Sequence, residues 1–271
     1  MPWSLAANLS MLFTERDLLE RIPAAADAGF DGVEVQFPYE LDASDLAKRL
    51  ASHAMPLALI NLPAGDLMSG GPGLAGVPDR TSTFRQALDV ALRYAARTRP
   101  ERVNILPGRL ADGVETEAAL NTLVDNLQLA CPAFASLGIG VTFEAINRHD
   151  MPGFLVATPG EQLEVMRRVG HSNLSVQLDL YHMARMGIDL MEAITDLSGL
   201  IGHVQFADAP ARGAPGSGTT GFAEAFSALA SVGYRGWLAA EYRPRGATES
   251  DLAWLDDWRS QGWIKTRASS G

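Results

Sequence analysis

Short apolar runs alternate with longer amphipathic segments along the whole chain. The runs are five to eight residues long and typical of buried strands; they cover residues 4–9, 32–36, 57–62, 102–106, 140–147, 174–179, 202–206 and 236–241. Between them, apolar residues recur every three or four positions, as on one face of a helix, in residues 14–28, 42–53, 84–95, 120–134, 158–169, 188–197, 223–232 and 252–258. Eight strands alternating with eight helices indicate an α/β fold of the (β/α)8 TIM-barrel type.

We predict that this barrel is a single domain over residues 1–262, followed by a short polar tail, 263–271, that frays. Thr158, Pro159 and Glu161 form the pattern of a capping box at a helix start. Pro23 lies inside the first predicted helix, so we expect a kink or a late start there. Residues 63–78 form a long loop with five glycines, and a loop of this length on a compact fold is usually functional, often a lid.

Composition and charge exclude several classes of protein. The 271 residues carry a net charge of −10, which disfavours nucleic-acid binding because that binding depends on Lys and Arg neutralising phosphates. No apolar run reaches the roughly 20 residues of a membrane span, and the start of the chain has no signal-peptide pattern. The one cysteine, Cys131, has no partner for an internal disulfide and is expected to be a buried thiol. We therefore expect a soluble, cytoplasmic protein without a membrane or nucleic-acid partner.

Four of the strand runs carry an oxygen-bearing side chain near their C-terminal ends, namely Glu144, Asp179, Gln205 and Glu241. Successive side chains of a strand point to opposite faces, so these four can all point into the barrel while their neighbours meet the helices. Active sites of TIM barrels lie at this end of the strands. The four residues therefore look like the walls of one site.

Several buried carboxylates facing one another are unfavourable without a cation. Three carboxylates and an amide oxygen are hard ligands, which suit Mg²⁺ or Mn²⁺ better than Zn²⁺. The alternative from spacing alone is that these are hydrogen-bonded acids at strand ends. His203 is a candidate fifth ligand, but it lies two residues deeper than Gln205 and is more easily explained as a residue that orients a ligand or packs in the core.

Several short motifs together carry a family resemblance: Ala7-Asn8-Leu9-Ser10-Met11-Leu12-Phe13, Phe37-Pro38-Tyr39, Asn61-Leu62-Pro63-Ala64-Gly65-Asp66, Glu144-Ala145-Ile146-Asn147, Gln177-Leu178-Asp179-Leu180-Tyr181-His182, and Gly236-Trp237-Leu238 with Glu241-Tyr242. From about residue 3 to residue 259 the chain resembles the hydroxypyruvate isomerase family of xylose-isomerase-like barrels. The resemblance implies that Glu144 and Glu241 are the catalytic acid/base pair. It also implies that these two hold the metal together with Asp179 and Gln205, and that His182 and Arg212 contact the substrate.

The implied reaction converts hydroxypyruvate into tartronate semialdehyde by proton transfer through an enediolate, in a glyoxylate- or carbohydrate-metabolism setting. No nicotinamide or flavin is needed, because the redox change is internal to the substrate. An acid substrate needs a cation, and Arg148 is a further candidate beside Arg212, although it is as easily a solvent-facing or loop-bracing residue. Asn8, at the end of the first strand, is a further candidate for substrate binding.

Other functions remain open at this point. The chain departs from the family pattern at Ala145, Ala209 and residues 219–222, and residues 243–246 and 254–259 look more like a sister group that acts on 2-oxo-tetronates. An isomerase or epimerase of longer sugars would keep the four ligands and change the pocket wall. An apurinic endonuclease shares the barrel but needs three zinc ions and many histidine ligands, against five scattered histidines here.

A sugar-acid-binding protein on an inactive barrel is the non-enzyme alternative, and the two intact glutamates argue against it. Barrels of this family commonly associate, so a homo-oligomer is possible. Four tryptophans either contribute to such an interface or pack on helix faces in the ordinary way: Trp3, Trp254, Trp258 and Trp263.

Overall fold

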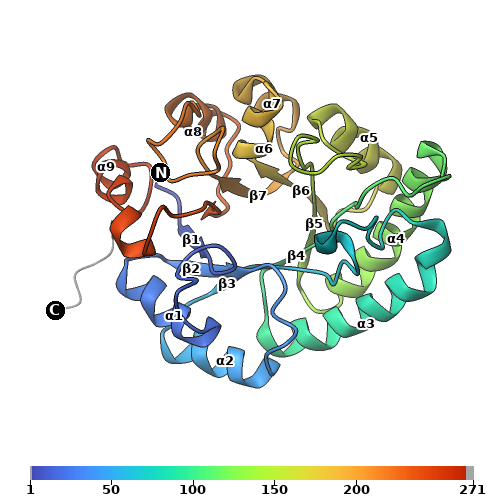
Figure 1. The fold of residues 1–271 in the computed structure, drawn as a ribbon, viewed down its shortest axis with the longest axis horizontal. Coiled ribbons are helices and arrows are strands. Elements are labelled where there is room, and N and C mark those ends of the chain that lie inside the picture. Colours follow the sequence, from blue (N-terminus) through green and yellow to red (C-terminus); the bar gives the residue numbers. More distant parts are fainter. Residues whose placement is uncertain (1, 267–271) are drawn as a thin grey trace.

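A computed structural model describes residues 2–266 and shows one closed barrel of eight parallel strands in sequence order, as the alternating pattern predicted (Figure 1). The strands are β1 Leu5–Asn8, β2 Gly32–Val35, β3 Leu57–Asn61, β4 Arg102–Asn104, β5 Gly140–Glu144, β6 Leu174–Asp179, β7 Ile201–Phe206 and β8 Leu238–Ala240. Strand β8 pairs with β1 and closes the ring, so the sheet has no free edge.

Helices surround the barrel and cover its outer face (Figure 1). They are α1 Leu18–Asp27, α2 Ala43–Ser52, α3 Thr81–Thr98, α4 Thr116–Ala135, α5 Pro159–Val169, α6 Leu180–Arg185, α7 Leu190–Asp196, α8 Phe222–Ser231 and α9 Trp254–Ser260, with 3-10 turns η1 Leu67–Ser69, η2 Pro78–Arg80 and η3 Thr248–Asp251. Phe143, Leu178 and Val204 lie in the main core with the helices, which confirms the predicted strand alternation.

Small side chains fill the barrel interior one layer below the strand ends. Ala6 and Ala239 pack there with Ala58, and the partly buried Trp237 packs against them. Since Ala6 and Ala239 precede Asn8 and Glu241 by two residues, the polar side chains form the layer above this apolar floor.

Helix α1 begins at Leu18, four residues later than predicted, and continues through Pro23. Proline removes the hydrogen bond to the carbonyl four residues earlier, which here belongs to Leu19. The Nε of Arg49, on α2, donates to this carbonyl over 3.1 Å. The side chain replaces the missing backbone donor, so the helix tolerates the proline.

The short helix α6 was not predicted, because six residues are too few for a periodic signal. Asp179 ends β6 and caps α6, since its Oδ1 accepts from the Tyr181 N–H over 2.8 Å. The predicted capping box of α5 is confirmed: Thr158 and Glu161 exchange both of its hydrogen bonds. Cys131 is buried, and burial raises the pKa of its thiol to about 12, so the expected buried thiol is confirmed.

The predicted fraying after Gly262 is wrong for residues 263–265. Trp3 donates its N–H to the carbonyl of Trp263 and accepts from the N–H of Lys265, at 2.9 and 3.0 Å, and Ile264 is buried. The remaining residues of the predicted tail, 267–271, lie outside the described part of the chain. Trp3, Trp254 and Trp258 pack in the core, which favours ordinary packing over an exposed interface for these three side chains.

The glycine-rich loop between β3 and α3 is held by side chains at both ends. The Oδ1 of Asp66 accepts from the Gly73 N–H over 3.0 Å and pairs with Nη1 of Arg80 over 2.8 Å. Nη1 of Arg109 donates to the carbonyls of Leu67 and Gly71. This loop carries Met68 to the rim of the cavity described below. Within residues 2–266 no helix has the length and apolarity to cross a membrane.

Candidate active site

A cavity of about 180 Å³ opens at the C-terminal ends of the strands. Its polar lining is formed mainly by Gln36, Glu144, Gln177, His182, Gln205, Arg212 and Glu241. Its apolar lining is formed by Phe37, Met68, Leu106, Ile146 and Met151. The cavity therefore offers a ligand both charged and apolar contacts, and four of the apolar residues belong to one hydrophobic cluster: Phe37, Leu106, Ile146 and Met151.

Glu144, the last residue of β5, is held by amide donors. Its Oε2 accepts from Nδ2 of Asn104 over 3.3 Å and from Nε2 of Gln177 over 3.0 Å. Burial, and then the negative charges of Glu241 and Asp179, raise the pKa of Glu144 well above its usual range. A carboxyl group with such a raised pKa can accept and return a proton near neutral pH.

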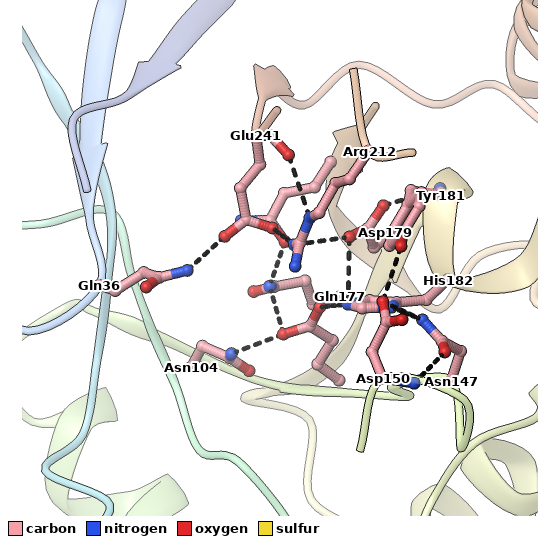
Figure 2. A network of polar contacts seen from close by, with 12 residues as sticks. Gln36, Asn104, Asn147, Asp150, Gln177, Asp179, Tyr181, His182, Arg212 and Glu241 are labelled. Carbon is pink, nitrogen blue, oxygen red and sulfur yellow. Dashed lines mark hydrogen bonds and ion pairs between the residues drawn. The ribbon is translucent and has the colours of Figure 1, made fainter. Parts of the chain in front are cut away.

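Glu241, directly after β8, has a different set of partners (Figure 2). Its Oε1 accepts from Nδ2 of Asn8 over 2.9 Å and from Nε2 of Gln36 over 2.6 Å, and its Oε2 forms an ion pair with Arg212. Burial raises the pKa of Glu241 above its usual value, although the charge of Arg212 acts in the opposite direction. Glu241 is thus the acid of the pair that already faces a cation.

Arg212 reaches the carboxylates from the loop after β7. Its Nη2 lies 3.5 Å from Oδ2 of Asp179, and its guanidinium carbon lies 5.0 Å from the centre of the Tyr181 ring. Burial alone lowers the pKa of Arg212, but Glu241 and Asp179 outweigh it and raise the pKa above its usual value. Arg212 therefore stays charged. Its backbone φ is 56°, in the left-handed region that non-glycine residues seldom adopt.

Gln205 is oriented by a buried acid that lies behind it. Its Nε2 donates to Oε1 of Glu34 over 2.6 Å, while its Oε1 accepts from Nε2 of Gln177 over 2.7 Å. His203 places Nε2 2.6 Å from Oε2 of the same Glu34 and is fully buried. His203 therefore lies behind the strand ends and does not face the cavity, in agreement with its predicted role as a supporting or core residue.

His182, on α6, faces two of the carboxylates. Its Nε2 lies 3.7 Å from Oε1 of Glu144 and 3.4 Å from Oδ2 of Asp179. On the other side of the ring, Nδ1 lies 2.6 Å from Nδ2 of Asn147 (Figure 2). Burial, and then the charge of Arg212, hold the pKa of His182 well below its usual value, so the imidazole is neutral at pH 7.

Comparison with known proteins identifies the family. A model of the xylose isomerase-like TIM barrel matches residues 22–258. The hydroxypyruvate isomerase of Escherichia coli K12 is 40% identical over 94% of this chain and 98% of its own length. The chain belongs to the hydroxypyruvate isomerase family.

Two further proteins that are similar to this chain carry other descriptions. The 2-oxo-tetronate isomerase of Pectobacterium atrosepticum is 38% identical over 93% of this chain and 97% of its own length. A crystal structure from Brucella melitensis, described as an AP endonuclease of family 2, superposes with a TM-score of 0.90 and is 40% identical, covering 95% of this chain and 99% of that one. Isomerases of two different acids thus lie at nearly the same distance from this chain.

Two of the residues predicted to bind substrate, Arg148 and Asn8, are not among those that line the cavity. Arg148 forms an ion pair of 2.7 Å with Glu161, donates to the carbonyl of Phe154, and has a side chain that is 41% exposed. It braces the loop before α5 and does not line the cavity. Asn8 is buried and donates to Oε1 of both Glu34 and Glu241. It supports Glu241 from the neighbouring strand and is not among the residues that line the cavity.

The donors at the cavity fit a divalent metal ion. Donor atoms of Glu144, Asp179 and His182 lie within 4.8 Å of one another, and this is the one such group within residues 2–266. Burial raises the pKa of Asp179 to about 7 even though Arg212 lowers it, because a single guanidinium does not balance the buried carboxylates. A dication would favour the ionised form of each acid, and the hard oxygen donors suit Mg²⁺ or Mn²⁺.

Sequence reasoning missed several side chains of this site. Glu34 lies on the inward face of β2 and Gln36 directly follows that strand. A Glu inside an otherwise apolar strand was the available signal. Asn104 ends β4 in the same way. Asn147 and Asp150 follow β5 in a loop, where no pattern separates functional from ordinary polar residues.

Proposed function

We propose that this protein is a metal-dependent sugar-acid isomerase that interconverts hydroxypyruvate and tartronate semialdehyde. One observation carries the proposal: Glu144 and Glu241 come from separate strands, line the same small cavity, and both have a raised pKa. Two such acids supply the base and the acid that a proton shift between neighbouring carbons needs.

Glu144, Asp179, Gln205 and Glu241 are the residues that would hold Mg²⁺ or Mn²⁺. When bound, such an ion polarises the substrate carbonyl and acidifies the adjacent C–H bond. The hydrogen bonds from Asn104 and Gln177 to Glu144, and from Asn8 and Gln36 to Glu241, fix both carboxylates at the cavity edge. This fixed geometry is what positions a base against a weakly acidic C–H.

The proton balance of the reaction requires no outside oxidant. One glutamate removes a proton from C3 of hydroxypyruvate, and the electron pair forms the C2–C3 double bond of an enediolate. A proton returned to C2 and the transfer of the O3 proton to O2 then give the aldehyde at C3 and the hydroxyl group at C2. C3 is oxidised and C2 is reduced, so neither nicotinamide nor flavin takes part.

Recognition of the acid falls to Arg212, which is the charged donor that reaches both the cavity and the carboxylates. His182 is a neutral donor or acceptor beside it. A guanidinium suits a carboxylate or an enediolate oxygen because its N–H groups form a planar fork.

The size of the cavity favours a short substrate. About 180 Å³ is below the roughly 300–1,000 Å³ typical of pockets for drug-sized ligands, which supports a three- or four-carbon acid over a longer sugar. A 2-oxo-tetronate is the second candidate. It is favoured by the 38% identity to isomerases of that acid and by Arg243, which lines the cavity and belongs to the segment that resembles them.

Nucleic-acid cleavage, suggested by the description of the Brucella relative, has less support. The net charge is −10, and of the five histidines only His182 and His203 are buried in the barrel. A non-catalytic binding protein would gain nothing from two buried acids with raised pKa values. A cytoplasmic location and association into homo-oligomers stay predictions from the sequence.

The test is a proton NMR assay in D₂O with EDTA-treated protein, supplied with Mg²⁺ or Mn²⁺, against hydroxypyruvate and a 2-oxo-tetronate in parallel. Metal-dependent conversion of hydroxypyruvate to tartronate semialdehyde is the expected result. Turnover of the four-carbon acid alone would keep the chemistry and replace the substrate. Conversion of neither acid would overturn the proposal.

A further inference from the structure

The buried contact between Asn147 and His182 fixes the hydrogen positions on an imidazole that faces the cavity. Nδ2 of Asn147 and Nδ1 of His182 lie 2.6 Å apart, and both side chains are almost fully buried. Which ring nitrogen carries the proton depends on whether the Asn147 amide presents its nitrogen or its oxygen to the ring.

Asp150 settles the orientation of that amide. Oδ1 of Asn147 accepts from the Asp150 backbone N–H over 2.8 Å, and Nδ2 of Asn147 donates to Oδ2 of Asp150 over 3.0 Å. A flipped amide would place two donors together at the backbone N–H and two acceptors together at the carboxylate. Oδ2 also accepts from the Tyr181 hydroxyl over 2.7 Å, which keeps the Asp150 carboxylate an acceptor. The amide nitrogen therefore faces His182.

We infer that Asn147 is a positioning residue that holds His182 as the tautomer protonated on Nε2, so that His182 donates a hydrogen bond into the cavity and is not a metal ligand. Nδ1 accepts from Asn147, and the one proton of the neutral ring lies on Nε2. That nitrogen faces Glu144 and Asp179 at 3.7 and 3.4 Å. A protonated nitrogen has no free lone pair for a metal ion.

This inference rests on the proposed function for its purpose. An isomerase of this kind develops negative charge on the substrate oxygens as the C–H bond breaks, and a neutral N–H donor stabilises that charge. The metal ligands are then carboxylate and amide oxygens, with the imidazole excluded. Asn147 does not itself touch the substrate, but it determines whether His182 acts as a hydrogen-bond donor or as a metal ligand.

The test uses full-length protein labelled with ¹⁵N-histidine and long-range ¹H–¹⁵N correlation spectra, which distinguish protonated from unprotonated ring nitrogens. His182→Gln assigns the His182 signals among the five histidines. We expect Nε2 protonated and Nδ1 unprotonated in the metal-free protein, and the same state after Mg²⁺ is added. A proton on Nδ1, or an Nε2 that loses its proton when Mg²⁺ binds, would overturn the inference.

Asn147→Asp places an acceptor against Nδ1 and should move the proton to that nitrogen. Asn121→Asp is the matched control, because Asn121 is exposed and lies beside Arg168 on the outer helices. In Asn147→Asp we expect kcat to fall by roughly 10- to 100-fold with little change in KM, while the control keeps both values and the wild-type tautomer. An Asn147→Asp variant that retains the Nε2 proton would contradict the assignment.

The spectra also separate this inference from the proposed function. They report the tautomer whether or not the protein turns over hydroxypyruvate. An active enzyme in which His182 has the other tautomer would contradict only the role of Asn147. An inactive protein with the expected tautomer would contradict only the proposed reaction.

Discussion

Oε1 of Glu34 accepts a hydrogen bond of 2.6 Å from the amide nitrogen of Gln205, and this contact decides which end of that amide is free. A carboxylate accepts and does not donate, so the amide oxygen is directed away from Glu34, toward Gln177 and the cavity. Asn8 donates to the same Oε1 of Glu34, and Nε2 of His203 contacts the other oxygen, Oε2. The proposed metal ligand Gln205 is thus oriented by an acid that is not among the residues lining the cavity.

Replacement of Glu34 should weaken metal binding. In Glu34→Gln the new amide can present a donor to Gln205, which frees the Gln205 amide to turn its nitrogen toward the site. Loss of such supporting contacts typically weakens metal affinity by about 10- to 100-fold. Calorimetric titration of the EDTA-treated protein with Mn²⁺ measures this. Glu164→Gln is the control, since Glu164 is exposed on α5 and pairs with Arg167. Equal affinity in the two variants would contradict the role given to Glu34.

The metal-free protein should lose stability as the pH rises above neutrality. Burial raises the pKa of Asp179 from 3.8 to about 7, so the folded state binds this proton more tightly than the unfolded chain does. That stabilisation is complete below about pH 4 and is lost as the pH rises through about 7. Glu144 acts in the same direction. The pKa of His182 is lowered from 6.5, so this residue destabilises the fold only below pH 6.5. Above pH 6.5, the change in the free energy of unfolding therefore comes from the carboxylates and not from His182.

Thermal unfolding of EDTA-treated protein from pH 6.5 to about pH 8 measures this effect. We expect Tm to fall by roughly 2–4 °C for each kcal/mol lost, and added Mg²⁺ to reduce the fall because it binds the ionised carboxylates. Asp179→Asn should flatten the metal-free profile. A Tm that rises over this range in the wild-type protein would show that the buried acids are already ionised.

Arg212 and Arg148 give opposite expectations for the same substitution. Arg212→Gln removes a buried charged donor at the cavity, and a hydrogen bond of this kind is worth about 1.5–3 kcal/mol, or roughly 10- to 100-fold in kcat/KM. Arg148→Gln breaks only an exposed ion pair with Glu161, so kcat/KM should change less than about twofold. Steady-state kinetics with hydroxypyruvate compare the two. A larger loss at Arg148 would mean that the loop before α5 takes part in binding.

Strand-end chemistry could be predicted from the sequence because the barrel fold fixes it. These side chains lie at or next to the C-terminal ends of buried strands, and the alternation of side chains along a strand predicts that they share the inner face: Glu144, Asp179, Gln205 and Glu241. Glu144, Gln205 and Glu241 line one cavity, and the donor atoms of Asp179 and Glu144 lie within 4.8 Å of each other. The roles of these residues as ligands and catalysts stay a proposal. The same reasoning overlooked Glu34, because it considered only acids at strand ends.

Periodicity does not predict positions outside the strands. The family resemblance did point to His182 and Arg212, and both line the cavity. Arg148 and Arg212 are both loop arginines, and only tertiary contacts reveal that one pairs with Glu161 and the other with Glu241. The polar tail also misled us, because the packing of Ile264 and the pairing of Trp263 with Trp3 involve residues at opposite ends of the chain.

Conservative replacement of each glutamate should separate the two halves of the reaction. Glu144→Gln and Glu241→Gln keep side-chain volume and remove the proton-transfer group, so isomerisation should fall by about 10²- to 10⁴-fold with an unchanged far-ultraviolet circular dichroism spectrum. In D₂O, the variant that lacks the base for C3 should show no deuterium in recovered hydroxypyruvate. The variant that lacks only the acid for C2 should still exchange the C3 proton without forming product, and this difference assigns each glutamate to its carbon. Rates close to wild type in either variant would rule out the mechanism that uses both carboxylates.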